Sequence, residues 1–422
     1  MKLGGTSWLG GRGRHDVAAP LLLLLLLLER PGAGASSWLG GTQRVEGLSD
    51  AAREPGAFAL RGGGSGAFPP ALSSIVVPQL RCDASAAAAA AAATAPRPKL
   101  TWLLVARNDG YLSEYNHPVA RLAATLGALF RGLSHHVLAE DSEVVLVDWN
   151  SEVPLLRDAR MRQLVLGMRK LARGVRFKVV VVPPATCRRH VPDPHVHISE
   201  VHALNYAIRH HVRGEMVLRI DQDTVVGSAF FRYLSLEKRR EWPAVADGKM
   251  WWGTRRDTDA QGAKALLESP EQFIAEHGMG VAPDRREDGR GAVGVFGMPL
   301  AKWVHAKGYN EHFLFWGHME IEFVRRMWRL CGGGMLNLAE EEELPVDKYP
   351  FYHIYHGPRT TGRKHNDMNA AKQGGNGGGW GMKGQAVPAV LCQGGCCAPA
   401  PRQGAPLDAA DCTCQKCAKL AP

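Results

Sequence analysis

The feature that most constrains the fold is a strict alternation of strand-like and helix-like segments, which begins at residue 99. Four apolar runs are typical of strands buried on both faces, namely 100–106, 143–148, 175–182 and 216–221. Three segments between them carry apolar side chains at helical spacing, namely 118–133, 154–172 and 199–211. This alternation predicts an α/β fold with a mostly parallel central sheet that helices flank on both faces.

The two ends of the chain differ in composition from this middle part. Among the 422 residues are 48 Gly and 26 Pro, an excess that gathers toward both ends together with a run of eight Ala at 86–93. Such stretches bury too little apolar surface to offset the entropy lost on folding. We expect a signal peptide or short signal-anchor, a disordered low-complexity stem, one folded domain, a Gly-rich linker and a Cys-rich tail, with the bounds 1–35, 36–98, 99–370, 371–390 and 391–422.

A run of eight Leu at 21–28 lies behind several basic residues near the N-terminus. The apolar stretch is shorter than the ~20 residues of a membrane-spanning helix, but it fits the core of a secretory signal. Ala33-Gly34-Ala35 then offers the small residues that signal peptidase accepts. The segment predicts entry into the secretory pathway, by a cleaved signal or by membrane anchoring through the Leu run.

Six of the nine cysteines lie in the predicted tail, namely Cys392, Cys396, Cys397, Cys412, Cys414 and Cys417. In an oxidising lumen this spacing is typical of a small disulfide-bonded unit. In a reducing compartment the same spacing would favour a zinc site. The sequence leaves both possibilities open.

The charge of the chain limits the class of partner only loosely. A formal net charge of +10 suits an anionic partner. The basic residues are not interleaved with aromatic ones, so we expect no nucleic-acid partner. No stretch of ~20 consecutive apolar residues occurs in the sequence, which excludes a polytopic membrane protein.

Polar and acidic residues follow three of the predicted strands. Arg107-Asn108 follows the first strand, Asp148 the second, and Asp221-Gln222-Asp223 the fourth. Ligands of open α/β sheets bind beyond the carboxyl ends of the strands, so these residues mark the candidate site. Two carboxylates two residues apart suit Mg²⁺ or Mn²⁺, although a turn can use the same pair. A dehalogenase-type phosphatase also carries Asp-x-Asp, but there the motif follows the first strand.

Several motifs together resemble a known family. The motifs are Arg107-Asn108, the stretch Val147-Asp148-Trp149-Asn150-Ser151, and His202-Ala-Leu-Asn205 leading into Asp221-Gln-Asp223. From about Lys99 to His356 the chain resembles GT-A-fold glycosyltransferases, notably the family 2 group and the β-1,4-galactosyltransferase and chondroitin-polymerase type enzymes. The resemblance implies that the nucleotide-sugar donor binds to Arg107, Asn108, Asp148 and Asp221.

The second half of the folded domain extends the resemblance to the acceptor side. Lys307-Gly308-Tyr309-Asn310-Glu311 and the stretch Phe315-Trp-Gly-His-Met-Glu-Ile-Glu-Phe323 are similar to the family's Gly-Phe-(Asp/Asn)-Glu and Trp-Gly-Gly-Glu-Asp-x-Glu-Phe segments. The resemblance implies that Glu320 is the catalytic base. It also implies that the acceptor contacts Trp316, Gly317 and Glu322.

A late histidine completes the set that the resemblance implies. In the galactosyltransferase type such a histidine joins the Asp-x-Asp motif on the metal. Here His356 matches that place best and His353 is second. The implied cofactor is Mn²⁺ or Mg²⁺, held by Asp221, Asp223 and His356.

The resemblance implies an inverting, metal-dependent glycosyltransferase of the Golgi lumen. It would move a sugar from a nucleotide-diphosphate donor, expected to be a UDP-sugar, to a hydroxyl of a glycan, glycoprotein or glycolipid. Trp149, Asn150, His318 and Met319 depart from the family's motifs. The alternative is therefore a catalytically inactive carbohydrate-binding protein on the same scaffold.

Overall fold

The computed structural model describes the chain over the folded domain and its C-terminal extension. The described ranges are 96–108, 117–171, 174–192, 196, 198–277, 293–314, 319–331, 335–337, 349–356, 376, 380–385, 387–393 and 396–399. All of them belong to one compact unit, Ala71–Pro422. The predicted signal segment and nearly all of the predicted stem lie outside these ranges. No helix within them is both long and apolar enough to cross a membrane.

Eleven strands join in one sheet in the described part of the chain. They are β1 (Leu100–Ala106), β2 (Ser142–Trp149), β3 (Arg176–Val182), β4 (Met216–Ile220), β5 (Thr224–Val226), β6 (Met250–Asp257), β7 (Val293–Pro299), β8 (Met335–Asn337), β9 (Phe351–His353), β10 (Ala389–Gln393) and β11 (Cys396–Pro399). Their order in the sheet is β11-β10-β3-β2-β1-β4-β7-β6-β9-β5, with β8 beside β6.

The helices lie between these strands in the sequence. They are α2 (Pro118–His135), α3 (Ala159–Leu171), α4 (Pro184–His190), α5 (Glu200–His210), α6 (Ser228–Arg239), α7 (Pro243–Ala246), α8 (Ala260–Glu268), α9 (Pro270–His277), α10 (Leu300–His305) and α11 (Met319–Cys331), with a 3₁₀ turn at Leu155–Arg157. Proline at the first position of α2 and the ring of His117, which accepts a hydrogen bond from the Val119 amide (3.2 Å), fix where that helix begins.

The predicted fold class is confirmed. The four central strands β3, β2, β1 and β4 are parallel, and in this register Leu103 of β1 lies between Val145 of β2 and Arg219 of β4. Strands β7 and β10 pair antiparallel with β4 and β3. Because parallel strands end on the same side, residues 107–108, 148 and 221 all lie at one edge of the sheet.

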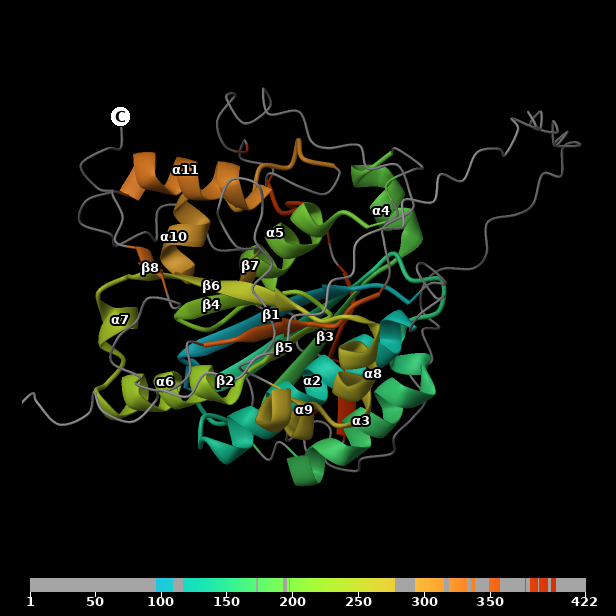
Figure 1. Cartoon of the computed structure of the whole chain (residues 1–422). Coiled ribbons are helices and arrows are strands. Elements are labelled where there is room, and N and C mark those ends of the chain that lie inside the picture. The colour runs from blue at the N-terminus through green and yellow to red at the C-terminus, as the bar shows by residue number, and fades with distance from the viewer. Residues whose placement is uncertain are drawn as a thin grey trace, which may run out of the picture. The chain divides into compact units, whose positions relative to one another are not determined.

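Helices lie on both faces of the sheet (Figure 1), and an apolar core lies between the sheet and the helices on each face. Alternate residues of β1 point to opposite faces, so Trp102 and Leu104 pack in one core while Leu103 packs in the other. Helices α2, α3 and α6 cover the first face, and α5, α10 and α11 cover the second. The sheet is thus buried on both sides, as the unbroken apolar runs predict.

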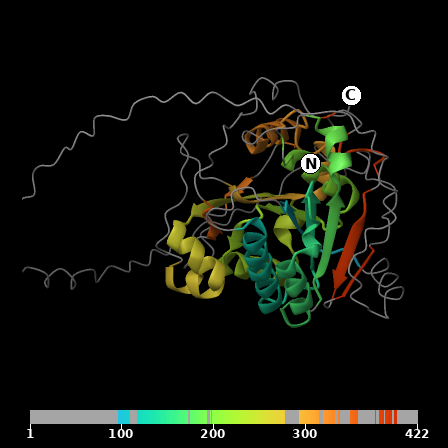
Figure 2. The same cartoon turned by 90° about the vertical axis from the view of Figure 1, so that its right-hand side faces the viewer.

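The chain beyond residue 370 differs from its prediction as linker and tail. Strand β10 pairs antiparallel with β3, β11 pairs with β10, and Figure 2 shows both at that edge of the sheet. Trp380 is 5% exposed, and the Arg209 guanidinium donates a hydrogen bond to its carbonyl oxygen (2.6 Å). The folded domain therefore extends beyond the predicted boundary, to residue 399. The Gly-rich segment was predicted as a linker from its composition, which gives no sign that single residues in it, such as Asn376 and Trp380, are buried.

Candidate functional site

A tight turn separates the two aspartates that follow β4. The backbone amide of Thr224 donates to the carbonyl oxygen of Asp221 (3.1 Å), so the chain turns between β4 and β5. As a result the two carboxylates face different partners. Asp221 lies against two arginines, whereas Asp223 lies against two histidines and a third arginine.

Asp223, His353 and His356 form a buried triad of possible metal ligands. Their nearest ligand atoms lie within 4.8 Å of one another, and no other such group occurs among the described residues. The Nε2 atoms of both histidines lie 3.6 Å from Oδ2 of Asp223, which leaves room for an ion between the three atoms. The two rings are nearly perpendicular, with centroids 5.1 Å apart. Two imidazoles and one carboxylate are a donor set that divalent transition metals favour.

Strand register places His353 at this point. His353 of β9 lies opposite Thr224 of β5 on one side and opposite Asp257 of β6 on the other. The amide of Ile354 donates to the carbonyl oxygen of Asp223 (2.9 Å), which ties the two strands together beside the triad.

Two glycines let β9 cross close to its neighbours. A Cβ atom on Gly253 of β6 or Gly294 of β7 would lie 2.3 or 2.4 Å from Phe351 side-chain atoms. Any other residue at either position would push Phe351, and with it His353, away from Asp223.

A carboxylate orients the first histidine of the triad. Nδ1 of His353 lies 2.7 Å from Oδ1 of Asp257, and this fixes the ring so that Nε2 faces Asp223. Metal-binding histidines commonly have such a carboxylate on the far nitrogen. The observed arrangement therefore fits a divalent metal ion.

The electrostatics of the triad favour a charged Asp223. Burial opposes its ionisation, but His353, Arg121 and His356 together hold the pKa of its carboxyl well below its ordinary value. Burial would lower the pKa of His353, but Asp223 and Asp257 raise it above its ordinary value. Arg121 of α2 is 2% exposed, and its Nε lies 3.9 Å from Oδ2 of Asp223.

Arg219 gathers three carboxylates at the end of β4. Its guanidinium pairs with Glu200 of α5, lies 2.7 Å from Oδ1 of Asp221, and lies 3.4 Å from Oε1 of Glu320 in the first turn of α11. Arg219 is 3% exposed. Buried charges of this kind need partners, and the three carboxylates supply them.

Arg255 of β6 connects this cluster to the triad. Its NH1 lies 3.6 Å from Oδ2 of Asp221 and its Nε lies 3.2 Å from Oδ1 of Asp257, the carboxylate that orients His353. The predicted base and the possible metal ligands are thus joined by a continuous series of ion pairs.

Three of the residues predicted to bind the donor, Arg107, Asn108 and Asp148, lie at the ends of β1 and β2. Hydrogen bonds join the two loops that follow these strands. The Asn108 amide donates to Oγ of Ser151 (2.7 Å), and Ser151 in turn donates to Oδ1 of Asp148. Oδ2 of Asp148 accepts from the Leu155 amide (2.8 Å). Burial raises the pKa of Asp148 to about 6, against these hydrogen bonds. Both carboxylate oxygens therefore order the loop after β2, and Arg107 lies near Cys187 of α4.

Glu322, predicted to bind the acceptor, is held by a buried ion pair. It is 2% exposed and pairs through both oxygens with Arg326 (2.7 and 3.1 Å). Arg326 also donates to the carbonyl oxygens of Ala306 and Gly308. The pair therefore anchors the turn before Tyr309 and is itself buried.

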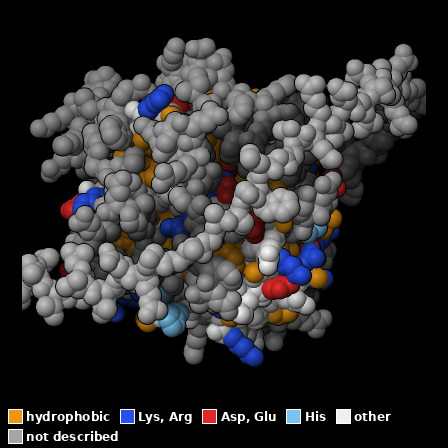
Figure 3. All heavy atoms as spheres, in the orientation of Figure 1, with side chains coloured by type: hydrophobic (Ala, Val, Ile, Leu, Met, Phe, Trp, Pro, Cys, Tyr) orange, Lys and Arg blue, Asp and Glu red, His pale blue; other side chains and the backbone are white. Residues whose placement is uncertain are grey.

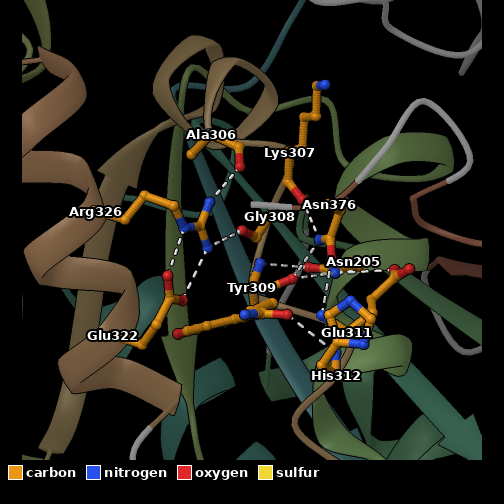
Figure 4. A network of polar contacts seen from close by, with 11 residues as sticks. Asn205, Ala306, Lys307, Gly308, Tyr309, Glu311, His312, Glu322, Arg326 and Asn376 are labelled. Atoms are coloured by element: carbon orange, nitrogen blue, oxygen red, sulfur yellow. Dashed lines mark hydrogen bonds and ion pairs between the residues drawn. The ribbon is translucent and has the colours of Figure 1, made fainter. Parts of the chain in front are cut away.

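Two asparagines also hydrogen-bond to the turn before Tyr309 (Figure 4). Asn205 and Asn376 both donate to the carbonyl oxygen of Tyr309 (2.8 and 2.5 Å). Gly308 has a φ of +67°, and a Cβ there would lie 2.1 Å from Oδ1 of Asn205. The turn is fixed by residues that are far apart in the sequence, and the sequence alone did not identify Asn376.

The structure brings together some of the predicted site residues and separates others. Asp223 and His356 lie in the triad together with His353, which was the second candidate for the metal-binding histidine. Asp221 instead contacts Arg219. Trp316 and Gly317 lie outside the described residues. Sequence reasoning missed five charged site residues, Arg121, Glu200, Arg219, Arg255 and Asp257, because none of them directly follows a predicted strand.

No protein-family model matches the chain, and no curated protein matches it significantly. Among solved structures it is similar to S. aureus TarS 1-349, at 14% identity and a TM-score of 0.35, over 61% of this chain and 60% of that one. It is similar to the galactosyltransferase LgtC, at 16% identity and a TM-score of 0.27, over 48% of this chain and 59% of LgtC. A third is HddC from Yersinia pseudotuberculosis, at 9% identity and a TM-score of 0.26, over 48% of this chain and 77% of HddC.

The chain spans about three fifths of the length of the first two structures. TarS has been crystallised with UDP-GlcNAc, and LgtC with donor and acceptor sugar analogues. At these identities and TM-scores the likeness assigns no activity, which has to be inferred from the site residues.

Proposed function

We propose that the chain is an inverting, metal-dependent glycosyltransferase that moves a sugar from a nucleotide-diphosphate donor, expected to be a UDP-sugar, to a hydroxyl group. The observation that carries the proposal is the buried triad of Asp223, His353 and His356, joined by ion pairs to the Arg219–Glu320 cluster. Transfer from such a donor needs a cation for the leaving diphosphate and a base for the acceptor hydroxyl, and the two groups of residues supply these sites.

The proposed metal ligands are Asp223, His353 and His356, and we propose Mn²⁺ over Mg²⁺. Two of the three donor atoms are imidazole nitrogens, which suit Mn²⁺ better than Mg²⁺, because Mg²⁺ prefers oxygen. When bound, the cation supplies positive charge that stabilises the departing diphosphate. The protein contributes a fixed set of ligands and, through Asp257, a fixed orientation of His353.

Glu320 is the proposed catalytic base. Its carboxylate is 3.4 Å from NH1 of Arg219, which holds it at the carboxyl edge of the sheet. The acceptor oxygen forms a bond to the anomeric carbon as the bond from that carbon to the diphosphate oxygen breaks. The hydroxyl proton passes to Glu320, and the nucleoside diphosphate leaves. Attack opposite the leaving group inverts the anomeric centre.

The donor is proposed to bind beside the loops after β1 and β2. Arg107 and Asn108 follow β1, and Asn108 Nδ2 donates to the carbonyl oxygen of Val153 (3.1 Å). Asp148 would act on the donor indirectly, because both its oxygens hold the loop that follows β2.

A donor-hydrolysis screen tests the proposed function. The full chain is incubated with Mn²⁺ and a panel of UDP- and GDP-sugars, and the release of nucleoside diphosphate is measured. We expect release from at least one donor, its abolition by EDTA, and its loss in Glu320→Gln when an acceptor is supplied. Glu215→Gln is the matched control, because Glu215 is exposed and pairs only with Lys99 in the described structure. Sugar binding without any release would instead favour the inactive carbohydrate-binding protein.

We further propose that the protein acts in the lumen of the secretory pathway, in the Golgi, reached through the N-terminal Leu run. Cys392 of β10 is disulfide-bonded, and disulfides persist in such a compartment. Protease protection of the protein in sealed microsomes tests this, because a cytosolic protein would be degraded.

A further inference from the structure

The Arg219 cluster carries more negative than positive charge. Arg219 is surrounded by Glu200, Asp221 and Glu320, and Arg255 lies against Asp221 and Asp257. Asp257 also faces His353, so among the described residues the two guanidinium groups are left to offset Glu200, Asp221 and Glu320, and one negative charge is in excess when all three are ionised. Figure 3 shows acidic side chains near the middle of this face of the molecule.

The open side of the cluster consists of two of these carboxylates. The side chains of Glu200 and Asp221 are each 23% exposed, whereas those of Glu320 and Arg219 are 10% and 3% exposed. A group that approaches Glu320 from this side therefore meets Glu200 and Asp221. Burial raises the pKa of Glu200 to about 7, with Asp221 and Glu320 adding to the effect of burial and Arg219 opposing it.

A buried hydroxyl beside the cluster has no partner. Tyr309 is 0% exposed, and its hydroxyl makes no hydrogen bond within the described part of the chain. Burial raises the pKa of Tyr309 well above its ordinary value, and Arg219 and the three carboxylates of the cluster are the charges that act on it. Buried hydroxyls are usually hydrogen-bonded, so the polar partner of this one lies in a bound ligand or outside the described residues.

The metal site does not cancel the excess charge of the cluster. The triad has one carboxylate, and Arg121 already faces it. The two positive charges of a divalent cation bound there are neutralised by the two negative charges of the donor diphosphate. The negative charge of the Arg219 cluster therefore remains, and the acceptor meets it.

We propose that Glu200, Asp221, Glu320 and Tyr309 form an acceptor subsite that selects an uncharged or cationic sugar and rejects a uronic acid. The inference rests on the proposed function, because the bound sugar is an acceptor only if the protein is a glycosyltransferase. Carboxylates accept hydrogen bonds from sugar hydroxyls or an ammonium group, whereas a sugar carboxylate would meet like charge in a partly buried site. The net charge of +10 of the whole chain gives the opposite expectation for its partners.

Binding of matched monosaccharides tests the proposal. Methyl β-glucoside, its uronic acid counterpart methyl β-glucuronide, and the 2-amino-2-deoxy glucoside are titrated by saturation-transfer NMR into the full chain loaded with Mn²⁺ and UDP. We expect the glucoside and the amino sugar to bind at least about tenfold more tightly than the glucuronide at pH 8, where Glu200 is largely ionised, and moderate salt. Glu200→Gln should reduce that ratio several-fold, whereas Glu200→Asp, which keeps the charge, should preserve it.

Glu215→Gln is the control for loss of one negative charge far from the cluster and should leave the ratio unchanged. The proposal is overturned if the glucuronide binds as tightly as the glucoside, if none of the three sugars binds, or if Glu200→Gln leaves the ratio unchanged. UDP release from a donor is measured in parallel samples of the same protein with Mn²⁺ and without added UDP. If no donor is hydrolysed, the proposed function fails, while the sugar ratio still decides the selectivity of the subsite.

Discussion

Nδ1 of His353 lies 2.7 Å from Oδ1 of Asp257, a contact that joins strands β9 and β6 and turns the other ring nitrogen toward Asp223. Asp257 contacts the ring nitrogen of His353 that is turned away from Asp223, so its effect on a bound metal is indirect. Carboxylates in this position fix the ring and increase the basicity of the ligating nitrogen.

Asp257→Asn should therefore weaken metal binding without abolishing it. We expect the Kd for Mn²⁺ to rise about 10–100-fold, because an amide holds the ring less firmly and donates less electron density. Electron paramagnetic resonance of free Mn²⁺ measures this directly. Asp247→Asn makes the same change at an exposed position and should leave the Kd as it is. Equal affinities of wild type and Asp257→Asn would contradict the role given to Asp257.

The two aspartates after β4 should differ in their effect on metal binding. Asp223→Asn removes the only carboxylate of the triad, and we expect Mn²⁺ affinity to fall by ~100-fold or more. Asp221→Asn should change it by less than about threefold, because Arg219 and Arg255 face that carboxylate. Each variant loses one negative charge, so the pair controls for net charge. Similar losses in the two variants would show that both aspartates bind the metal.

Asp148 should make the stability of the metal-free protein depend on pH. The pKa of its carboxyl is raised to about 6 in the folded state, so its stabilising effect is complete below the ordinary aspartate range and is lost as pH rises through about 6. At pH 7 and above, the ionised form costs about 3 kcal/mol relative to the protonated one. Asp148→Asn does not titrate, so its stability relative to wild type should increase by that amount between pH 4 and pH 7.5. Urea unfolding in EDTA measures the difference, and a difference independent of pH would contradict the shift.

Glu322→Gln should destabilise the protein, whereas Glu320→Gln should change its stability little. The first variant leaves Arg326 buried without a charged partner, which costs about 3–5 kcal/mol. Adding Arg326→Met should recover part of that loss, since the uncompensated charge is removed. Thermal unfolding of the single and double variants measures the coupling. If Glu322→Gln is as stable as wild type but loses acceptor binding, the acceptor role implied by the resemblance is restored.

A chain that ends at residue 370 should be much less stable than one that ends at 399. The shorter chain lacks strand β10 and the side chains of Asn376 and Trp380, all of which pack on the domain. We expect loss of cooperative unfolding or a fall in Tm of 10 °C or more, on the order of several kcal/mol. A chain ending at 399 keeps every contact named here and serves as the control.

The parallel half of the fold could be predicted from the sequence because its signal is continuous. The run 100–106 was predicted as a strand and is β1, since buried parallel strands read as unbroken apolar segments. Strands β5 and β9 are three residues long and carry no such pattern. Their pairing depends on contacts between residues more than a hundred positions apart, which periodicity cannot reveal.

The site was predictable where residue type and strand end coincide. Asp223 was identified in this way, whereas His356, with His353 as the second choice, was identified through the family resemblance. Arg219 and Arg255 lie within strands, where a charged residue is usually a solvated one, and only the fold shows that both are buried. Asp221 was assigned to the metal because it is two residues from Asp223, but the turn at Thr224 directs it elsewhere.

The position of β10 at the edge of the sheet has a consequence for how the protein is made. Strand β3 lies some two hundred residues before β10 in the chain, and its outer edge stays unpaired until β10 is added. Asn376, which holds the Tyr309 turn, is also synthesised late. During translation the nascent domain therefore exposes an open strand edge and an unfixed turn until residues 376–393 have been synthesised. A chaperone that covers β3 on the ribosome would prevent aggregation at this stage, and premature termination would leave that edge open permanently.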